Sequence, residues 1–207
     1  MWWFDIAGLA QRVSAIETGL IDPSAIIEAG AVLDESEGPI SIGARSKICA
    51  GAIVKGPISI GANCMIGYYS VIRGPAVLGD DVRVGYATEI SRALLGERVS
   101  VGPMCFIAHS RIDEGAYLGA MVRTSNHRLD QRPISVRDGV RDVQTGLEKL
   151  GCWIGAGAAL GIQVIVLPGR VIAAGSTFEP RVTISRNLPK GHYRVRQQIE
   201  LVEGRGR

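Results

Sequence analysis

The chain has 207 residues, of which 46% are hydrophobic and 21% charged, and its formal net charge at pH 7 is +3. Such a small positive charge does not indicate a nucleic-acid-binding protein. No apolar run is long enough for a membrane-spanning helix and no secretory leader is recognisable, so we expect a cytoplasmic protein without a membrane partner. The four cysteines are scattered and predict neither disulfides nor a metal site.

Residues 1–20 form a separate segment because their apolar side chains recur at helical spacing. These side chains are Trp2, Trp3, Phe4, Ile6, Leu9, Val13 and Ile16. The spacing predicts a short N-terminal helix. Since the segments that follow predict an open-ended stack of strands, we expect this helix to cap the first coil of the stack.

Residues 42–90 carry an aliphatic side chain at every sixth position without exception. The series is Ile42, Ile48, Val54, Ile60, Ile66, Ile72, Leu78, Val84 and Ile90. A helix repeats at about 3.6 residues and a strand at 2, so neither explains this period. A period of six is typical of a solenoid whose flat faces are each one short strand long.

This pattern resembles the hexapeptide repeat of left-handed parallel β-helices, in which three hexapeptides make one triangular coil. We therefore expect an all-β fold in which each aliphatic side chain points inwards and stacks on its counterpart one coil away. A single coil cannot bury its own inner face, so stability must come from stacking of neighbouring coils.

The register extends in both directions with slips. Upstream it includes Ile21, Ile27 and Leu33. Downstream there are five-residue steps from Ile90 to Leu95 and from Ile107 to Ile112, and the pattern ends at Ile184 after one long interruption. This predicts roughly seven coils in one domain over residues 21–186, with a basic C-terminal tail over residues 187–207.

The interruption covers residues 123–152, where the repeat disappears. Loops of this length are uncommon in compact folds and are usually functional. It contains His127, one of three histidines in the chain; the others are His109, inside a coil, and His192, in the basic tail. Its apolar side chains predict that the insertion projects from the β-helix and lies against a neighbouring subunit.

The insertion begins with the sequence Thr124-Ser-Asn-His127-Arg-Leu-Asp130. It resembles the loop of the galactoside, maltose and xenobiotic acetyltransferases, where a histidine precedes an aspartate by three residues. In those enzymes this histidine is the general base that deprotonates the acceptor hydroxyl. The resemblance implies that His127 is the catalytic base, and we expect Asp130 to fix the tautomer of its imidazole.

A second resemblance covers more of the chain, through the stretch from Arg141 to Gly157 and the segments Leu167-Pro-Gly and Arg186-Asn-Leu-Pro. These residues look like the C-terminal domain of archaeal-type bifunctional sugar-1-phosphate nucleotidylyltransferase/amino-sugar N-acetyltransferases, here without the nucleotidylyltransferase domain. The resemblance implies that Asn126 is an acceptor-site residue.

One departure from that family affects the catalytic base. Pro103 occupies the position of the family's catalytic histidine. Either His127 or His109 therefore supplies the base, or the chemistry has been lost. We favour His127 and keep His109 as the second candidate.

Together the resemblances imply direct transfer of an acyl group from acetyl-CoA to a sugar or sugar nucleotide, by a homotrimer that requires no metal. Candidates for CoA binding are Trp153, Lys149, Arg132 and Gly161, although for Trp153 we favour packing at the edge of the core. The alternative is a non-catalytic assembly or regulatory module with a separate nucleotidylyltransferase as partner. The fold does not decide between them, because function depends on the site.

Overall fold

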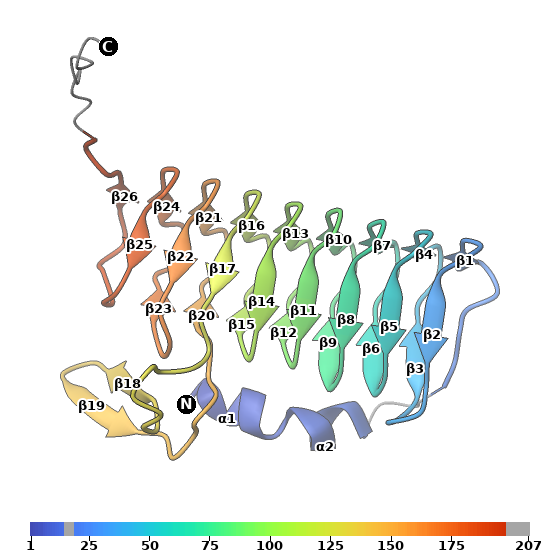
Figure 1. The fold of residues 1–207 in the computed structure, drawn as a ribbon, viewed down its shortest axis with the longest axis horizontal. Helices are drawn as coiled ribbons and strands as arrows, with labels where there is room; N and C mark the ends of the chain where they lie inside the picture. Colours follow the sequence, from blue (N-terminus) through green and yellow to red (C-terminus); the bar gives the residue numbers. More distant parts are fainter. Residues whose placement is uncertain (15–18, 198–207) are drawn as a thin grey trace, which may run out of the picture.

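The computed structural model describes residues 1–14 and 19–197. Over these residues the chain winds into a parallel β-helix whose short strands stack in three sheets along the molecule (Figure 1). The predicted all-β, left-handed β-helix class is confirmed as a parallel β-solenoid. The coil count was too low, because the first sheet contains nine stacked strands and the solenoid has about nine turns.

The three sheets are named by their numbers of strands. The nine-stranded sheet contains β1 (Ile26–Ile27), β4 (Lys47–Ile48), β7 (Met65–Ile66), β10 (Arg83–Val84), β13 (Ser100–Val101), β16 (Tyr117–Leu118), β21 (Ala159–Leu160), β24 (Thr177–Phe178) and β26 (His192–Tyr193). The eight-stranded sheet contains β2 (Val32–Asp34), β5 (Ile53–Lys55), β8 (Val71–Arg73), β11 (Glu89–Ser91), β14 (Phe106–Ala108), β17 (Arg123–Thr124), β22 (Ile165–Val166) and β25 (Thr183–Ile184). The seven-stranded sheet contains β3 (Ile40–Ile42), β6 (Ile58–Ile60), β9 (Ala76–Leu78), β12 (Leu94–Leu95), β15 (Arg111–Ile112), β20 (Trp153–Ile154) and β23 (Val171–Ile172).

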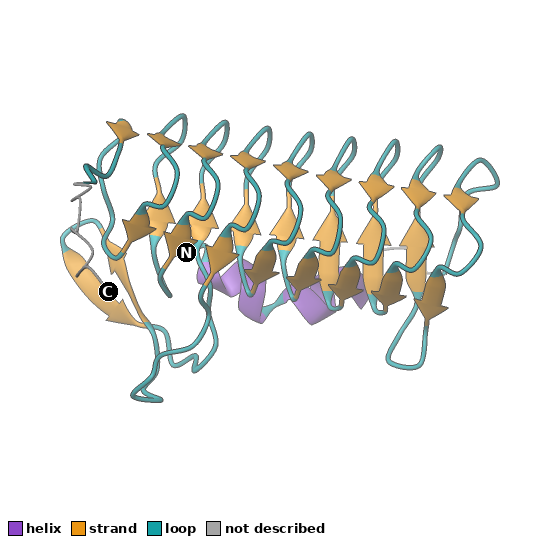
Figure 2. Ribbon diagram, turned by 45° about the horizontal axis from the view of Figure 1, so that its top comes forward, coloured by secondary structure: helices purple, strands orange, loops and turns teal. Residues whose placement is uncertain are grey.

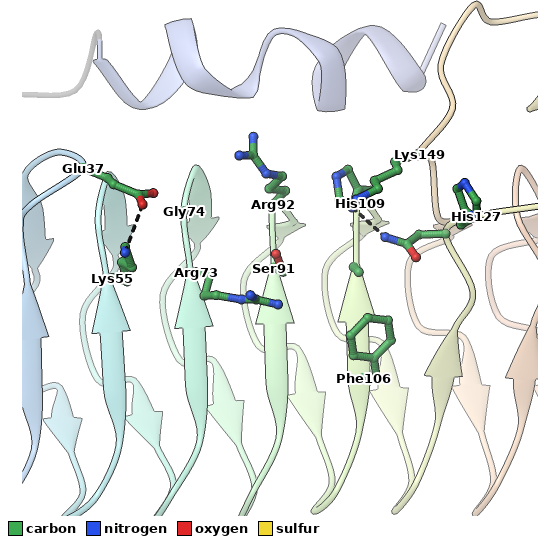
Figure 3. Close-up of a pocket in the computed structure, with 12 residues that line it drawn as sticks. Glu37, Lys55, Arg73, Gly74, Ser91, Arg92, Phe106, His109, His127 and Lys149 are labelled. Carbon is green, nitrogen blue, oxygen red and sulfur yellow. Dashed lines mark hydrogen bonds and ion pairs between the residues drawn. The ribbon is translucent and has the colours of Figure 1, made fainter. Parts of the chain in front are cut away.

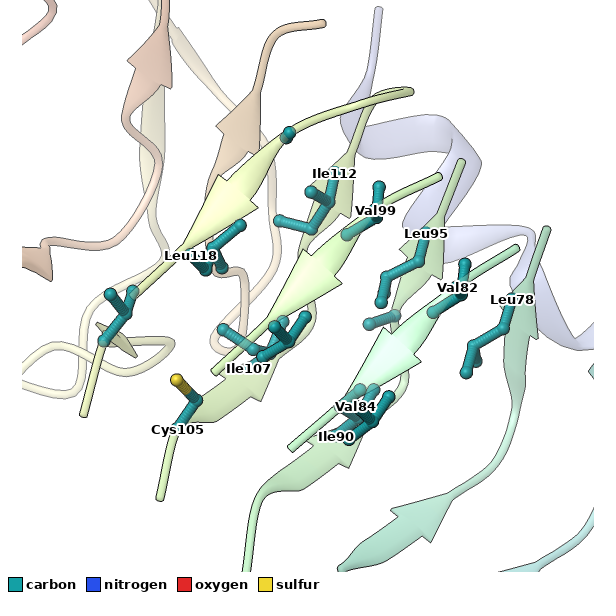
Figure 4. Close-up of a cluster of buried hydrophobic side chains, with 14 of the residues drawn as sticks. Leu78, Val82, Val84, Ile90, Leu95, Val99, Cys105, Ile107, Ile112 and Leu118 are labelled. Carbon is teal, nitrogen blue, oxygen red and sulfur yellow. The ribbon is translucent and has the colours of Figure 1, made fainter. Parts of the chain in front are cut away.

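The predicted inward ladders form the core. Ile42 pairs in register with Ile60, and Ile60 with Leu78 on the next coil. These side chains are at most 2% exposed, and similar stacks continue along the solenoid (Figure 4). Burial of one such side chain contributes about 1.5–3 kcal/mol, so stability accumulates coil by coil.

The C-terminal end of the β-helix extends beyond the predicted boundary at residue 186. Leu188 bridges to Ile172, and β26 pairs with β24. The Tyr193 ring stacks on Phe178 with their centroids 4.9 Å apart. The beginning of the predicted basic tail is therefore part of the last coil, while residues 198–207 of that tail lie outside the described residues.

The N-terminal segment forms two short helices, α1 (Trp3–Ala7) and α2 (Leu9–Ser14). They run along the side of the solenoid next to the seven-stranded sheet (Figures 1 and 2), so the predicted cap over the first coil is wrong. The physical reason is that their apolar side chains have partners there: those of α1 pack against the insertion, and α2 contacts β9 of the seven-stranded sheet. Residues 15–18 of the predicted helix lie outside the described residues, and neither described helix is long enough to span a membrane.

The insertion contains an antiparallel hairpin of β18 (Ser135–Asp138) and β19 (Arg141–Gln144). Ile134, Val136 and Leu150 are at most 1% exposed and cluster with three N-terminal side chains, those of Trp2, Trp3 and Ile6. Three apolar side chains of the insertion are thus buried within their own chain, Val143 and Leu147 are partly buried against the same cluster, and Leu129 is exposed. Contact of the insertion with a neighbouring subunit stays a prediction. Val140, at the hairpin turn, is exposed.

Candidate functional site

The candidate site lies along the corner at which the eight-stranded sheet turns into the seven-stranded sheet. The last residues of β5, β8, β11 and β14 stack there in register. They are Lys55, Arg73, Ser91 and Ala108. Successive strands of a sheet are about 4.8 Å apart, so these residues form a straight row across four coils.

The residue that follows each member of this row determines what the corner presents. Gly74 follows Arg73, whereas Arg92 follows Ser91 and His109 follows Ala108. Both Arg92 and His109 have left-handed backbone conformations, with φ values of 51° and 49°. Their N–H groups donate to the carbonyl oxygens of Arg73 (3.0 Å) and Ser91 (2.9 Å), so each corner is fixed by the preceding coil.

These two corners are the places where the hexapeptide pattern shortens. In the Gly74 corner, two residues separate the row residue from the next buried residue of the chain. In the Arg92 and His109 corners, one residue does. The five-residue steps of the sequence are therefore the signal that could have located the site. They mark the positions where a side chain replaces a Gly-Pro turn.

A cleft of about 940 Å³ follows this corner (Figure 3). Several side chains that line it were not predicted from the sequence, notably Lys55, Arg73, Ser91, Arg92 and Phe106. Of the predicted residues, the cleft brings together His109, Asn126, His127 and Lys149. Its charged lining residues are four cations and, among the residues that the structure describes, one carboxylate, that of Glu37.

His109 is the most perturbed group in the cleft. Its half-buried imidazole has a pKa lowered to about 4, first by burial and then by the positive charges of Arg92 and Lys149. Asn126 Nδ2 donates to His109 Nδ1 over 2.9 Å. Within the described residues the other ring nitrogen, Nε2, has no hydrogen-bond partner, so it is the atom available to a substrate.

The two ends of the insertion meet beside His109. Leu150 N–H donates to the Asn126 carbonyl over 3.0 Å, and Gly151 N–H donates to the His109 carbonyl over 2.8 Å. His127 and Lys149 form an antiparallel bridge. This closure explains why residues 22 positions apart in the sequence line one wall of the cleft.

The cations of the cleft differ in their partners. Lys55 pairs with Asp34 (3.6 Å) and Glu37 (3.0 Å), and Arg73 pairs with Glu89. Neither Arg92 nor Lys149 forms an ion pair within the described part of the chain. Two of the four positive charges therefore remain uncompensated, and both lie beside His109.

Asp130 does not reach the His127 imidazole. Its carboxylate accepts from Arg128 Nε (2.8 Å) and Nη2 (2.5 Å), and this guanidinium lowers the pKa of Asp130. The Arg132 N–H donates to the same carboxylate over 3.3 Å, and Arg132 is not among the described residues that line the cleft. The expected orienting contact from Asp130 to His127 is thus absent, because Arg128 holds the carboxylate.

A second hollow of about 700 Å³ shares His127 with the cleft. Leu129, Ile134, Leu167 and Pro168 supply apolar surface, and Arg170 lies on its wall. Arg170 donates to the carbonyl oxygens of Pro168, Ser185 and Ser135, and burial lowers the pKa of its guanidinium.

The remaining candidates for CoA binding lie elsewhere. Trp153 donates from Nε1 to Asp113 over 2.7 Å, and Arg111 stacks over its ring, so Trp153 packs the outer face of the seven-stranded sheet against the N-terminal segment. A Cβ on Gly161 would lie 2.8 Å from the Pro180 nitrogen of the next coil. Its lack of a side chain serves coil stacking. The described residues contain no cluster of three or more metal-binding side chains.

Comparison with known proteins identifies the family. The bacterial transferase hexapeptide family (six repeats) matches residues 39–74. The uncharacterized acetyltransferase YaiX of Escherichia coli O6:K15:H31 is 50% identical over 168 residues, which are 81% of this chain and 73% of that protein. The putative uncharacterized acetyltransferase YaiX of Escherichia coli K12 is 49% identical over the same shares.

A solved structure shows the same fold at low sequence similarity. The Arabidopsis UDP-N-acetylglucosamine acyltransferase superimposes with a TM-score of 0.51 at 15% identity, over 84% of this chain and 72% of that one. The repeat, the solenoid and the relatives at about half identity agree. The chain belongs to the hexapeptide-repeat acyltransferases, in the family of the YaiX acetyltransferases.

Proposed function

We propose that the protein transfers an acyl group from acetyl-CoA to a hydroxyl or amino group of a sugar or sugar nucleotide, with His109 as general base. The observation that carries this proposal is the half-buried imidazole on the cleft wall. One of its nitrogens is held by Asn126, and the other has no partner among the described residues. Positioned bases of this kind contribute about 10²–10⁴-fold to a rate.

The reaction needs no covalent enzyme intermediate. The acceptor oxygen or nitrogen attacks the thioester carbonyl while His109 takes its proton. The carbon–sulfur bond then breaks, and the imidazolium returns the proton to the departing CoA thiolate. The imidazole thus ends in its starting state, and one acyl group has exchanged sulfur for oxygen or nitrogen.

Asn126 controls the tautomer of His109, and the reaction requires the opposite orientation of its amide from the one in the structure. When its amide nitrogen donates to Nδ1, the proton of the neutral imidazole sits on Nε2. Rotation of the amide by half a turn lets its oxygen accept from Nδ1–H, and Nε2 then presents a lone pair to the acceptor. Asn126 is therefore a positioning residue that acts through His109.

The second hollow is the proposed place for the acyl donor. It adjoins the cleft at His127, so a thioester carbonyl at their junction would be near an acceptor in the cleft. Its apolar wall suits a pantetheine chain, and Arg170 has no carboxylate partner within the described residues to compete with a phosphate.

We also propose a homotrimer. Aromatic and methionine side chains gather at the corner between the nine- and eight-stranded sheets, where Tyr68, Tyr69, Tyr86 and Met104 are each at least 39% exposed. An exposed apolar group of this kind is typical of an interaction surface. Light scattering should give three times the 22.0 kDa chain mass.

The direct test compares the three histidines. CoA release from acetyl-CoA is measured with a panel of hydroxyl and amino sugars and their nucleotides. His109→Ala should lower kcat by about 10²–10⁴-fold. His192→Ala is the matched control, because His192 binds Glu179 on the last coil, outside the cleft.

His127→Ala separates the two candidate bases. If His127→Ala loses activity while His109→Ala retains it, the base is His127 and the enzyme class stands. If the wild type neither binds CoA nor transfers an acyl group to any acceptor in the panel, the assembly-module alternative replaces this proposal.

A further inference from the structure

The uncompensated charges of the cleft are concentrated at one end. Arg92 and Lys149 lie beside His109 and have no carboxylate partner within the described residues. Arg73 and Lys55, one and two coils before Ser91 in the row, are paired with carboxylates. The uncompensated positive charge is therefore concentrated next to His109 and is not spread evenly along the cleft.

The charged groups that face His109 from the surrounding elements all have the same sign. They are Arg92 from the turn after β11 and Lys149 from the end of the insertion, with the cationic row residues Arg73 and Lys55 further along. His127 is the other titratable side chain that lines the cleft. Glu37, the one lining carboxylate among the described residues, is engaged by Lys55. In this surrounding the protonated imidazole is strongly disfavoured, and a base works best when its pKa is near the working pH.

We propose that the acceptor carries an anionic group, a phosphate or a carboxylate, which Arg92 and Lys149 bind, and that this group activates His109 by compensating the two positive charges beside it. The inference rests on the proposed role of His109 as base. It makes Arg92 and Lys149 the residues that determine specificity, since a neutral acceptor would leave His109 a poor base.

Electrostatic linkage gives this proposal a measurable consequence without turnover. An anion held within about 4–6 Å of an imidazole raises its pKa by roughly one to three pH units. By reciprocity, protonation of His109 must tighten anion binding by the same factor. Sulfate is a suitable probe because its charge stays constant over the range in which histidine titrates.

The experiment follows the imidazole carbon-bound protons of the full chain by NMR during a pH titration. His127→Gln and His192→Gln assign the three histidine signals. At equal ionic strength, replacing chloride by sulfate should raise the pKa of His109 by roughly one to three pH units. An unchanged His109 pKa in sulfate would overturn the proposal.

Two variants and one control identify the anion's partners. In Arg92→Gln and in Lys149→Gln, the His109 pKa without sulfate should be higher than in the wild type. The rise of this pKa on adding sulfate should be smaller than in the wild type. Lys55→Gln should respond like the wild type, because its charge is already paired with Asp34 and Glu37. If Lys55→Gln loses the sulfate-induced rise of the His109 pKa as fully as Arg92→Gln does, the anion binds elsewhere and the assignment of Arg92 and Lys149 as its partners is refuted.

Turnover then distinguishes the two proposals. A sugar phosphate, a uronate and the corresponding neutral sugar are compared, and the charged acceptors should react faster in the wild type but not in Arg92→Gln. Equal rates for charged and neutral acceptors would refute the anion requirement while leaving the acyltransferase function intact. A sulfate response without any acyl transfer would refute the proposed function and leave the anion site standing.

Discussion

The corner between the eight- and seven-stranded sheets is built in two ways within one molecule. In two earlier coils it is a two-residue Gly-Pro turn, at Gly56-Pro57 and at Gly74-Pro75. In the next two coils it is one residue shorter, and Arg92 and His109 take its place in left-handed conformations. The same stacking thus supports a purely structural corner and a corner that carries chemistry.

The third altered corner carries the insertion, which leaves the solenoid after β17 and returns at β20. The residues of the cleft nearest His109 therefore come from three consecutive corners of one column. Since each coil is stabilised by its neighbours, a change at one corner leaves the inner ladder intact. This division explains how a repetitive core accommodates a non-repetitive site.

The insertion corner depends on a distant part of the chain, unlike the corners before it. Trp3 is 4% exposed and packs in the cluster that contains Ile134 and Val136 of the insertion. Trp3→Ala should lower the free energy of unfolding by about 3–5 kcal/mol, measured by urea denaturation. Phe4→Ala is the control, because Phe4 is 62% exposed. Equal losses in both variants would contradict the role of this cluster.

The Gly-Pro corner should be the less tolerant of the two corner types. A Cβ on Gly74 would lie 2.8 Å from the Pro57 nitrogen and closer still to its carbonyl oxygen, both of them backbone atoms that cannot move away. We expect Gly74→Ala to cost about 1–3 kcal/mol of stability.

Arg92→Ala tests the other corner type at the neighbouring coil. It should change stability by no more than about 0.5 kcal/mol, since its side chain is exposed and lies outside the core. If Arg92→Ala proves as destabilising as Gly74→Ala, the shorter corner is a structural element too.

The sequence predicted the solenoid because its inner ladder repeats strictly, and each Ile or Val of that ladder has one possible place in the coil. It predicted the insertion for the complementary reason, since the repeat stops there. The position of the N-terminal helix could not be predicted, because its partner is a cluster formed by residues far apart in the chain, such as Trp3 and Ile134.

The candidate site was predicted in part. His109, Asn126, His127 and Lys149 do line one cleft. Arg92 was missed because no residue motif marks it; only the five-residue step from Ile90 to Leu95 does. Contacts between side chains were the least predictable feature. The spacing of His127 and Asp130 in the sequence does not reveal that Arg128 binds the Asp130 carboxylate instead.

Substitutions at Asn126 test whether its hydrogen bond to His109 controls the activity of this imidazole as a base. Asn126→Leu should lower kcat by about tenfold, corresponding to the loss of one hydrogen bond that orients His109. In Asn126→Asp the carboxylate accepts from Nδ1–H and raises the pKa of His109, so activity should begin to fall at a higher pH than in the wild type as the solution is acidified. A pH–rate profile checks both variants. Coincident profiles for wild type and Asn126→Asp would mean that Asn126 does not act through His109.

The smallest expected effect concerns how His109 couples stability to pH. Its pKa in the folded protein is about 4, against an ordinary value of 6.5 for a free histidine side chain. Between these values the unfolded chain binds a proton that the folded chain does not, so stability falls as the pH is lowered through this interval. In His109→Gln this contribution is absent, and its urea midpoint should decrease less than that of the wild type between about pH 7.5 and pH 4.5.

Sulfate should reduce the wild-type decrease, because an anion beside Arg92 and Lys149 favours the protonated imidazole. If the urea midpoints of the wild type and His109→Gln decrease equally as the pH is lowered, the folded protein does not disfavour protonation of His109. The Arg92 and His109 corners would then not differ electrostatically from the Gly-Pro corners.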